Sequence, residues 1–295
     1  MSAGPPTDVA ARPAASVATS VLLAGAVREL AAASDTPRLD AELLLAFATG
    51  RSRSSLLAFP ERTVPAFAAN GFAGFLARRA QGEPVAYLTG TREFYSLTLT
   101  VNAAVLVPRP ETELCVDAVL GRCTALRRPA VLDVGTGSGA IALAVKHACV
   151  HANVTGLDVS ADALAVARVN AERLGLAVRW LESSWFAGVE GQRYDVIASN
   201  PPYVRSADVR GALAFEPRLA LDGGGDGCDA YRMLFMAAKR HLNASGALVL
   251  EHGAEQRAEL VALAESSGWR VAEMHDDLAG RARVLVLELE RSTSI

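Results

Sequence analysis

The sequence predicts an α/β protein with a doubly wound, mostly parallel sheet, and three observations support this prediction. Apolar, β-branched segments alternate with helical patterns from about residue 130 to the end of the 295-residue chain. A glycine-rich turn follows the first of these segments, and a helical pattern follows the turn. Crossover connections of about a dozen residues or more join parallel strands, so the alternation favours a parallel sheet.

Seven strands and four helices account for this part of the chain. The last two strands are separated only by DDLAGRA, which is too short for a crossover helix, so they are expected to pair antiparallel at or near an edge. The predicted strands are 130–134, 154–158, 178–182, 194–199, 246–251, 269–275 and 283–290, and the predicted helices are 139–150, 161–174, 229–242 and 254–267.

The N-terminal part of the chain has a helical pattern of apolar residues. Apolar residues recur at helical spacing up to about Gln81, which predicts a small helical domain over 17–90. This spacing is seen at Leu39, Leu43, Leu44 and Phe47, and again at Phe67, Phe72, Phe75 and Leu76.

The N-terminal end of the chain is rich in small and apolar residues. Residues 1–16 are rich in alanine and proline and are expected to be disordered. The apolar run 17–27 has a faint resemblance to a signal peptide, but it continues into Arg28 and Glu29 without a clear cleavage site, which favours an amphipathic helix. No segment reaches the roughly 18 uncharged apolar residues of a membrane-spanning helix, and a cytoplasmic location is expected.

A β-hairpin is predicted between the helical domain and the alternating region. Residues 93–107 are rich in β-branched and aromatic side chains, with Asn102 as the candidate turn residue. Pro108 and Pro110 then stiffen the chain. The segment 91–113 is interpreted as a hairpin linker that leads into a second domain over 114–295.

Charge and cysteine usage exclude several classes of protein. A net charge of -3 provides no basic field of the kind that non-specific nucleic-acid binding requires. The four cysteines form no C-x-x-C pair, which argues against a zinc site and a disulfide framework. His147 and His151 have metal-ligand spacing, but no third ligand is near them in the sequence, so no metal site is expected.

The stretch VLDVGTGSGAIALAV predicts a strand, a tight glycine turn and a helix. Gly135, Gly137 and Gly139 let the backbone approach a ligand closely, and the helix N-terminus offers free N–H groups. The pattern also fits, loosely, a dinucleotide fingerprint with Ala140 in the last place. The loop therefore indicates a nucleotide-like cofactor without choosing which one.

Two carboxylates accompany this loop. Asp158 ends the next strand, where a carboxylate can accept hydrogen bonds from a ribose diol, and its alternative role is to cap the helix that begins near Ala161. Ser160 already suits that cap. Asp133 either tethers the loop amides or lies near a cationic cofactor.

The fourth strand ends in SNPPYV, which has no evident use in a dinucleotide enzyme. DVGTGSGAIAL followed by SNPPYV resembles the seven-strand S-adenosylmethionine-dependent methyltransferases that act on planar nitrogen. Such a nitrogen is a poor nucleophile because its lone pair is delocalised. The Asn200 side-chain oxygen and the Pro201 carbonyl are two acceptors that can hold its N–H bonds, and the prolines turn that carbonyl outward. No strong general base is then required.

Further stretches narrow the resemblance. GEPVAYLTGTREFYSLTLTV, VLVPRPETE, FEPRLALDGGGDGCDAYR, LEHG and DLAGRARV resemble the protein glutamine methyltransferases that modify peptide chain release factors, and the similarity runs from about Leu39 to Glu290. It implies a seven-stranded Rossmann-like methyltransferase sheet with its last strand antiparallel, an N-terminal helical substrate-recognition domain and a hairpin linker. The implied substrate is the glutamine of the Gly-Gly-Gln loop of class-I release factors, and a monomer is expected.

The resemblance also implies site residues. The cofactor contacts would be Gly135, Thr136, Gly137, Ser138, Gly139, Asp158, Trp185 and Asn200. The substrate contacts would be Asn200, Pro201, Pro202 and Tyr203, of which Asn200, Pro201 and Tyr203 are expected to be catalytic.

Some of these positions have open alternatives. Trp185 either lies against the adenine or packs in the core, and Tyr203 either packs against the substrate amide or is a core residue. Ser184 stands where the family commonly has an acidic residue, which predicts weaker cofactor binding. The charged residues of PRPETE, which are Arg109, Glu111 and Glu113, either shape the mouth of the crevice or serve a structural linker.

Three other functions share parts of these patterns. An amino-methyltransferase of the N6-adenine type would use the same chemistry on DNA or RNA, but the chain lacks a basic, base-reading region. A non-catalytic S-adenosylmethionine-binding module has no need for intact Asn200, Pro201 and Pro202. A nicotinamide dehydrogenase would need an acid/base arrangement that the sequence does not show.

Overall fold

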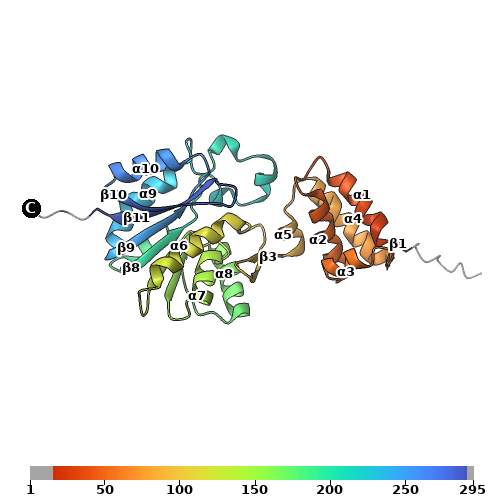
Figure 1. The fold of residues 1–295 in the computed structure, drawn as a ribbon, viewed down its shortest axis with the longest axis horizontal. Helices are drawn as coiled ribbons and strands as arrows, with labels where there is room; N and C mark the ends of the chain where they lie inside the picture. Colours follow the sequence, from red (N-terminus) through yellow and green to blue (C-terminus); the bar gives the residue numbers. More distant parts are fainter. Residues whose placement is uncertain (1–15, 291–295) are drawn as a thin grey trace, which may run out of the picture. The chain divides into compact units, whose positions relative to one another are not determined.

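The computed structural model describes residues 16–290, and the predicted α/β fold is confirmed in it. The seven strands lie in the order β10-β11-β9-β8-β5-β6-β7 (Figure 1). The predicted disordered tail lies, apart from Ser16, outside the described residues. The strands are β5 Ala130–Val134, β6 Asn153–Asp158, β7 Arg179–Glu182, β8 Tyr194–Ser199, β9 Leu242–Glu251, β10 Trp269–Asp276 and β11 Ala282–Leu289.

Strand direction follows the prediction. β5 pairs parallel with β6 and β8, and the parallel pairing extends to β7 on one side and β9 on the other. β11 is antiparallel to both of its neighbours, β9 and β10. The last two strands therefore pair antiparallel at an edge, with β11 inserted next to β9. β9 begins at Leu242, earlier than predicted, because the helix before it ends at Ala237 and a short 3-10 turn follows.

Both faces of the sheet are apolar, as expected for a doubly wound fold. In β8, Val196 and Ala198 belong to one buried cluster and Ile197 to the other. Neighbouring residues of β9 and β11 alternate in the same way. Each face must therefore be covered by helices.

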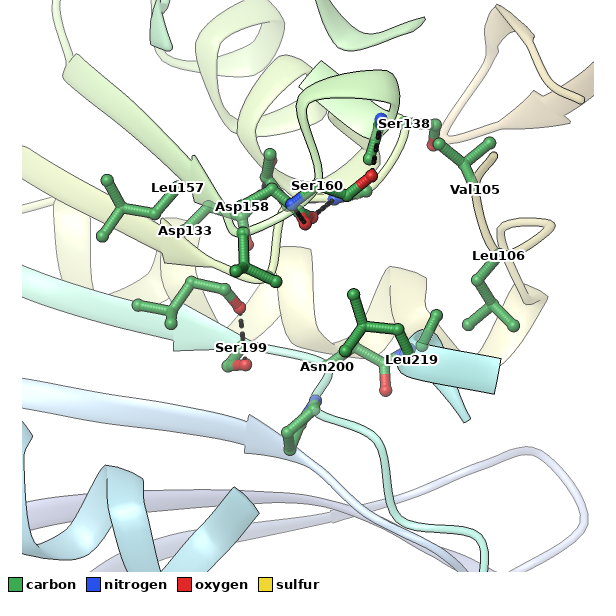
Figure 2. Close-up of a pocket in the computed structure, with 18 of the residues that line it drawn as sticks. Val105, Leu106, Asp133, Ser138, Leu157, Asp158, Ser160, Ser199, Asn200 and Leu219 are labelled. Carbon is green, nitrogen blue, oxygen red and sulfur yellow. Dashed lines mark hydrogen bonds between the residues drawn. The ribbon is translucent and has the colours of Figure 1, made fainter. Parts of the chain in front are cut away.

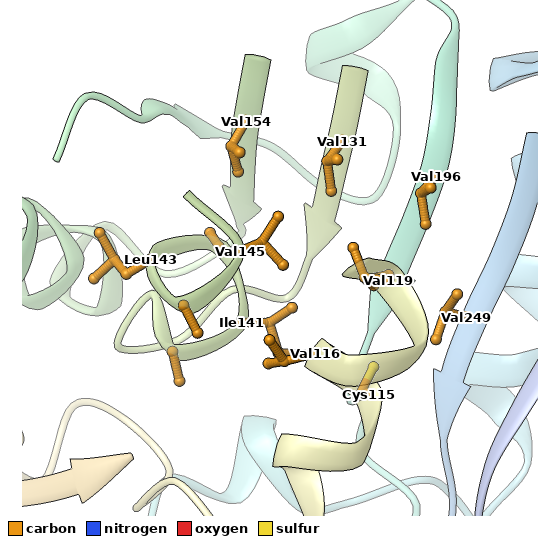
Figure 3. Packing of buried hydrophobic residues seen from close by; sticks show 14 of the residues in the cluster. Cys115, Val116, Val119, Val131, Ile141, Leu143, Val145, Val154, Val196 and Val249 are labelled. Carbon is orange, nitrogen blue, oxygen red and sulfur yellow. The ribbon is translucent and has the colours of Figure 1, made fainter. Parts of the chain in front are cut away.

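Three helices cover one face and two cover the other (Figure 1). Figure 3 shows Val116 and Val119 of one helix and Ile141 of the next packed toward Val131 of the sheet. The first group is α6 Glu113–Cys123, α7 Ala140–Ala148 and α8 Ala161–Leu174, and the second is α9 Asp229–Ala237 and α10 Arg257–Ser266.

The chain divides into two compact units, Met1–Thr89 and Gly90–Ile295. The described part of the first unit is helical, with a core that includes Leu44 and Phe72. Its elements are β1 Val17–Ala18, α1 Thr19–Leu30, α2 Pro37–Thr49, α3 Arg53–Ala58, β2 Thr63–Val64, α4 Ala66–Ala80 and α5 Val85–Thr89. No helix in the described part of the chain is long and apolar enough to span a membrane.

The hairpin is present, but its turn is not where the sequence predicted it. β3 Thr91–Phe94 pairs with β4 Leu97–Thr100, and the turn is formed by Tyr95 and Ser96, whose φ values are 50° and 60°. Asn102 lies beyond β4, where its Oδ1 accepts from the Ala104 amide at 2.9 Å. The prediction of Asn102 as the hairpin turn was therefore wrong.

A tertiary contact explains why this turn has no sequence signal. Two-residue turns with positive φ normally use Asn or Gly. Here the Tyr95 amide donates to Glu113 Oε1 at 2.8 Å, and the Tyr95 hydroxyl donates to Asp117 at 2.8 Å. Both acceptors lie on α6, so the helix supports a turn that local propensity does not favour.

Candidate active site

A pocket of about 360 Å³ opens at the carboxyl ends of β5, β6 and β8 (Figure 2). It contains most of the residues that the sequence predicts for the site. The predicted residues in its lining are Gly135, Thr136, Gly137, Ser138, Asp158, Trp185, Asn200, Pro201 and Pro202. Gly139 and Tyr203 are not part of the lining.

The glycine loop is tied to the neighbouring strand. The Gly135 and Thr136 amides both donate to the carbonyl of Leu157, at 2.9 and 2.8 Å. Gly135 and Gly137 have φ values of 73° and 54°, which side chains rarely adopt, so the turn requires glycine at both positions. The loop therefore presents its backbone to the pocket in one fixed conformation.

Gly139 has a packing role. It lies at the N-terminus of α7 with a φ of 82°. A Cβ atom there would lie 2.9 Å from the Trp180 ring and 3.0 Å from Leu143. Its lack of a side chain lets the helix approach the sheet closely.

Asp133 tethers the loop and the following helix. Its Oδ2 accepts from the Thr136 hydroxyl at 2.6 Å and from the Ala142 amide at 3.2 Å. The side chain is buried, and Oδ1 has no partner within the described residues. Burial raises the pKa of Asp133 to about 7, although both hydrogen bonds oppose that rise.

Asp158 ends β6 and does not cap α8. Its Oδ2 accepts from the Gly137 amide at 2.8 Å and its Oδ1 from the Ser160 amide at 2.9 Å. Ser160 itself caps the helix by accepting from the Ala163 amide at 3.1 Å. An ionised carboxylate has about four acceptor positions, so Asp158 keeps capacity for a ligand diol.

Asn200 directly follows β8. The preceding Ser199 donates to the Val134 carbonyl at 2.7 Å, which joins the ends of β8 and β5 (Figure 2). The Asn200 Nδ2 donates to Thr112 Oγ1 at 3.2 Å. No hydrogen bond within the described residues uses its Oδ1, so that oxygen is available as an acceptor at the pocket.

Trp185 lies at the pocket in a strained backbone conformation. Its φ is 52°, which is uncommon for a bulky residue. The Ser183 hydroxyl donates to the Trp185 carbonyl at 2.9 Å and accepts from the Gly188 amide at 2.8 Å. These bonds hold the turn that carries Trp185, which lines the pocket and also packs against the buried cluster on the α9 and α10 face.

Tyr203 lies beside the buried cluster on the α9 and α10 face. Its carbonyl accepts from Gln256 Nε2 at 3.4 Å. Burial raises the pKa of its hydroxyl to about 12, so the phenol is neutral at ordinary pH. Its predicted contact with the substrate stays a prediction.

The charged residues of PRPETE make structural contacts. Arg109 pairs with Glu216, whose Oε2 accepts from the Val107 amide at 2.9 Å. Glu111 lies 3.6 Å from Arg283. As described above, Glu113 supports the hairpin turn, so all three acidic or basic side chains have partners.

The mouth of the pocket is apolar, which the sequence did not predict. Figure 2 shows Leu106 and Leu219 on the same side of the pocket. The Arg109–Glu216 pair joins the two segments that carry them. The two segments belong to the stretches VLVPRPETE and FEPRLALDGGGDGCDAYR, whose apolar residues gave no signal of their own. The additional lining residues are Ala104, which precedes the first stretch, and, within the two stretches, Val105, Leu106, Pro108, Thr112, Pro217, Leu219 and Ala220.

Known proteins resemble this chain over both units. Residues 22–90 match a family profile described as the PrmC N-terminal domain, and residues 116–268 match one described as the methyltransferase small domain. A ribosomal protein L11 methylase from Lactobacillus delbrueckii subsp. bulgaricus superposes with a TM-score of 0.48 at 19% identity, covering 62% of this chain and 81% of that one.

Sequence relatives cover nearly the whole chain. A release factor glutamine methyltransferase of Moorella thermoacetica is 44% identical over 88% of this chain and 95% of its own length. One of Salmonella typhimurium is 42% identical over 85% of this chain and 92% of its own length. With the predicted fold and the pocket at the strand ends confirmed, this chain belongs to the release factor glutamine methyltransferase family.

Proposed function

We propose that this protein transfers the methyl group of S-adenosylmethionine to the side-chain amide nitrogen of the glutamine in the Gly-Gly-Gln motif of class-I peptide chain release factors. The observation that carries the proposal is the placement of Asn200. Its Oδ1 accepts no hydrogen bond from residues 16–290, Asn200 lines the same pocket as the glycine loop, and two prolines follow it. The name of the relatives supports the substrate.

The pocket fits the proposed cofactor. The glycine loop offers backbone that a ligand can approach closely, and Asp158 offers acceptor positions for a ribose diol. The Trp185 indole provides a flat surface for an adenine. Asp133 would place a carboxylate near a positively charged sulfur. The cofactor supplies an electrophilic methyl group bound to that sulfur.

The chain's own residues position the nucleophile. A side-chain amide has two N–H bonds, and the Asn200 Oδ1 and the Pro201 carbonyl are two acceptors that can hold both. Positioning of this kind contributes about 7 to 11 kcal/mol in favourable cases. Positive charge develops on the nitrogen as its new bond to carbon forms, and the two fixed dipoles stabilise that charge. The nitrogen then releases a proton to solvent, so no general base is needed.

Each of three segments of the chain has its own proposed role. Residues 17–90 would recognise the release factor, 91–113 would act as the linker, and 114–295 would carry out the transfer. The apolar mouth at Leu106 and Leu219 supports a peptide substrate more than a phosphate backbone, which needs basic contacts.

The experiment that tests the substrate uses methyl-labelled S-adenosylmethionine. Purified class-I release factor, the same factor with Gln→Ala in its Gly-Gly-Gln motif, and duplex DNA are offered in parallel. Label is expected on the unmodified factor alone. Label on DNA, or equal label on the Gln→Ala factor, would refute the proposal.

Asn200→Ala tests the two-acceptor mechanism. Loss of one acceptor that acts mainly in the transition state is expected to lower kcat by about 10²- to 10³-fold, while calorimetry shows cofactor binding close to wild type. Asn153→Ala is the matched control, because Asn153 is exposed at the start of β6. A kcat for Asn200→Ala within twofold (about the scatter of such assays) of the control would rule out the mechanism.

A further inference from the structure

Asn170 of α8 is completely buried and joins two parts of the chain that are far apart in the sequence. Its Nδ2 donates to the carbonyls of Thr100 and Ser138, at 3.0 Å each, and its Oδ1 accepts from the Thr100 amide at 2.6 Å. Thr100 is the last residue of β4, and Ser138 belongs to the glycine loop. One side chain therefore connects the hairpin to the loop that lines the pocket.

The bonds to Thr100 take the place of a neighbouring strand. Across the hairpin, the Val101 amide donates to the Gly90 carbonyl at 3.1 Å. In an antiparallel ladder such bonds are made by alternate residues of a strand, so the backbone groups of Thr100 point away from β3. The Asn170 side chain offers them one acceptor and one donor, as the backbone of a further strand would.

The bond to Ser138 takes the place of a helix bond. A carbonyl at the start of a helix usually accepts from the amide four residues later. The Ala142 amide has that place after Ser138, but it donates to Asp133 Oδ2 at 3.2 Å. Ser138 is buried, and a buried carbonyl without a partner is costly. Asn170 supplies the partner.

These three hydrogen bonds fix the orientation of the Asn170 amide. The Thr100 amide is a donor and must meet an oxygen, whereas the carbonyls of Thr100 and Ser138 must meet N–H groups. A rotated amide would place N–H against N–H and oxygen against oxygen. Both N–H groups of Asn170 are thus in use, one on the hairpin and one on the glycine loop.

The two parts that Asn170 joins belong to walls of the same pocket. Ser138 lines it directly. The segment 104–112, which follows β4 after three residues, supplies several residues of the apolar mouth. The position of this segment relative to the glycine loop therefore depends on where the end of β4 is held.

We propose that Asn170 is a positioning residue that holds the glycine loop and the end of the hairpin in the arrangement that the cofactor site requires. Order in the loop and order at the end of the hairpin then support each other. Cofactor that binds at the loop stabilises the hairpin by the same link. This inference rests on the proposed function, because it takes S-adenosylmethionine as the ligand of the loop.

A purely structural role for Asn170 predicts a different result. Loss of a buried amide then lowers the free energy of unfolding, but protein that is still folded binds the cofactor as wild type does. A positioning role predicts weaker cofactor binding by fully folded protein. Calorimetry well below the unfolding temperature, with circular dichroism to confirm folding, separates the two roles.

Two variants of the full chain and one control make this comparison. Asn170→Ala removes all three hydrogen bonds. Asn170→Asp keeps the shape and an acceptor for the Thr100 amide, but an ionised carboxylate has no hydrogen to donate to the two carbonyls. Arg173→Ala is the matched control, because Arg173 donates to Thr100 Oγ1 from the same helix and makes no hydrogen bond with the glycine loop within residues 16–290.

Both Asn170 variants are expected to raise the Kd of S-adenosylmethionine about tenfold, whereas Arg173→Ala binds within about twofold of wild type. At saturating cofactor, kcat of the Asn170 variants is expected to stay within about threefold of wild type, because the groups that hold the nucleophile are unchanged. A folded Asn170→Ala or Asn170→Asp protein with the wild-type Kd would overturn the inference.

Hydrogen exchange tests the link to the hairpin without methyl transfer. The probe is the Val101 amide, which is bonded across the hairpin and not to Asn170. Saturating cofactor is expected to slow its exchange in wild type and in Arg173→Ala, and to leave it unchanged in Asn170→Ala. Wild type that binds the cofactor without any slowing at Val101 would overturn the inference, even if neither Asn170 variant folded.

A second exchange measurement needs no cofactor. The Gly139 amide donates to the Thr136 carbonyl at 2.8 Å inside the glycine loop. Its exchange is expected to be faster in Asn170→Asp than in wild type and Arg173→Ala. If wild type bound no S-adenosylmethionine, the proposed function would be lost, and these rates alone would decide the positioning role. Equal rates in the three proteins would overturn it.

Discussion

Asp133 is the next-to-last residue of β5 and Asp158 the last of β6, and both accept hydrogen bonds from the glycine loop, but their surroundings differ. Asp158 is partly exposed and accepts from two backbone amides. Asp133 is buried, with one oxygen unpartnered within the described residues. Burial raises the pKa of Asp133 to about 7, so its charge depends on pH near neutrality.

The raised pKa of Asp133 predicts a pH-dependent stability. The native state keeps this proton at a pH where the unfolded chain, with a carboxyl pKa near 3.8, has lost it. Its stabilising contribution is therefore full at acidic pH and declines as pH rises from about 4 to about 7. Asp133→Asn stays neutral and does not lose this contribution. The denaturant midpoint of the variant, measured relative to that of wild type, is therefore expected to be higher at about pH 8 than at about pH 5. Denaturant unfolding at both pH values measures this, and parallel pH profiles would contradict it.

Ser184 carries a prediction about cofactor affinity. It is exposed and lines the pocket, at a position where the resemblance described above implies an acidic residue. A charged acceptor forms a stronger hydrogen bond than a hydroxyl, so Ser184→Asp is expected to bind S-adenosylmethionine about three- to tenfold more tightly by calorimetry. Ser184→Asn serves as the neutral control and should show a smaller gain. Equal or weaker binding by Ser184→Asp would refute the prediction.

The loop and helix that follow β5 depend on glycine for two separate reasons. Gly135 and Gly137 have open space where a Cβ atom would lie, so their positive φ values are the constraint. Gly139 adds a close approach to the Trp180 ring, and Gly156 of β6 would place a Cβ atom 2.4 Å from the same ring. Trp180 thus fits between α7 and the sheet only because both glycines lack side chains.

Gly139→Ala is therefore expected to lower the free energy of unfolding by more than backbone strain alone would lower it. Gly175→Ala is the matched control, because Gly175 also has a positive φ, of 64°, but nothing lies within 4 Å of its Cβ position. Positive φ costs alanine about 1–2 kcal/mol, and overpacking adds about 1–3 kcal/mol. Chemical denaturation of both variants measures the difference. Equal losses of unfolding free energy would show that the contact with Trp180 is accommodated.

At the scale of the whole molecule, the two units have separate cores. The buried residues of one cluster run from Ala26 to Leu88, and those of the two clusters of the sheet run from Phe94 onward. All residues of the pocket also lie in the second unit. The pocket and the two clusters of the sheet therefore contain no residue of the first core.

This separation predicts the behaviour of a fragment. Residues 90–295 are expected to bind S-adenosylmethionine within about threefold of the full chain, because the site is complete in them. Methylation of whole release factor by the fragment should fall by at least about tenfold, whereas methylation of a short Gly-Gly-Gln peptide should be similar for both. Calorimetry and labelled methyl transfer measure these quantities. Equal activity of fragment and full chain on the whole factor would refute a recognition role for the helical unit.

Patterns that are local in the sequence were predicted well. The seven strands and the antiparallel end follow from the alternation of apolar runs with helices and from the length of DDLAGRA. Most of the predicted site residues meet at one pocket because parallel strands end at a common edge. The hairpin turn at Tyr95 and Ser96 could not be predicted, since its support comes from side chains on α6.

By itself, the sequence determined the α/β fold, the glycine loop and the placement of Asn200 at the end of a strand, because each depends on neighbouring residues and on strand order. Only the tertiary structure decided which way the Asn200 amide points, what the charged residues of PRPETE bind, and that the mouth of the pocket is apolar. The physical reason is that these features join Thr112 with Asn200 and Arg109 with Glu216, which lie 88 and 107 residues apart in the chain. Folding alone brings such groups within hydrogen-bonding distance.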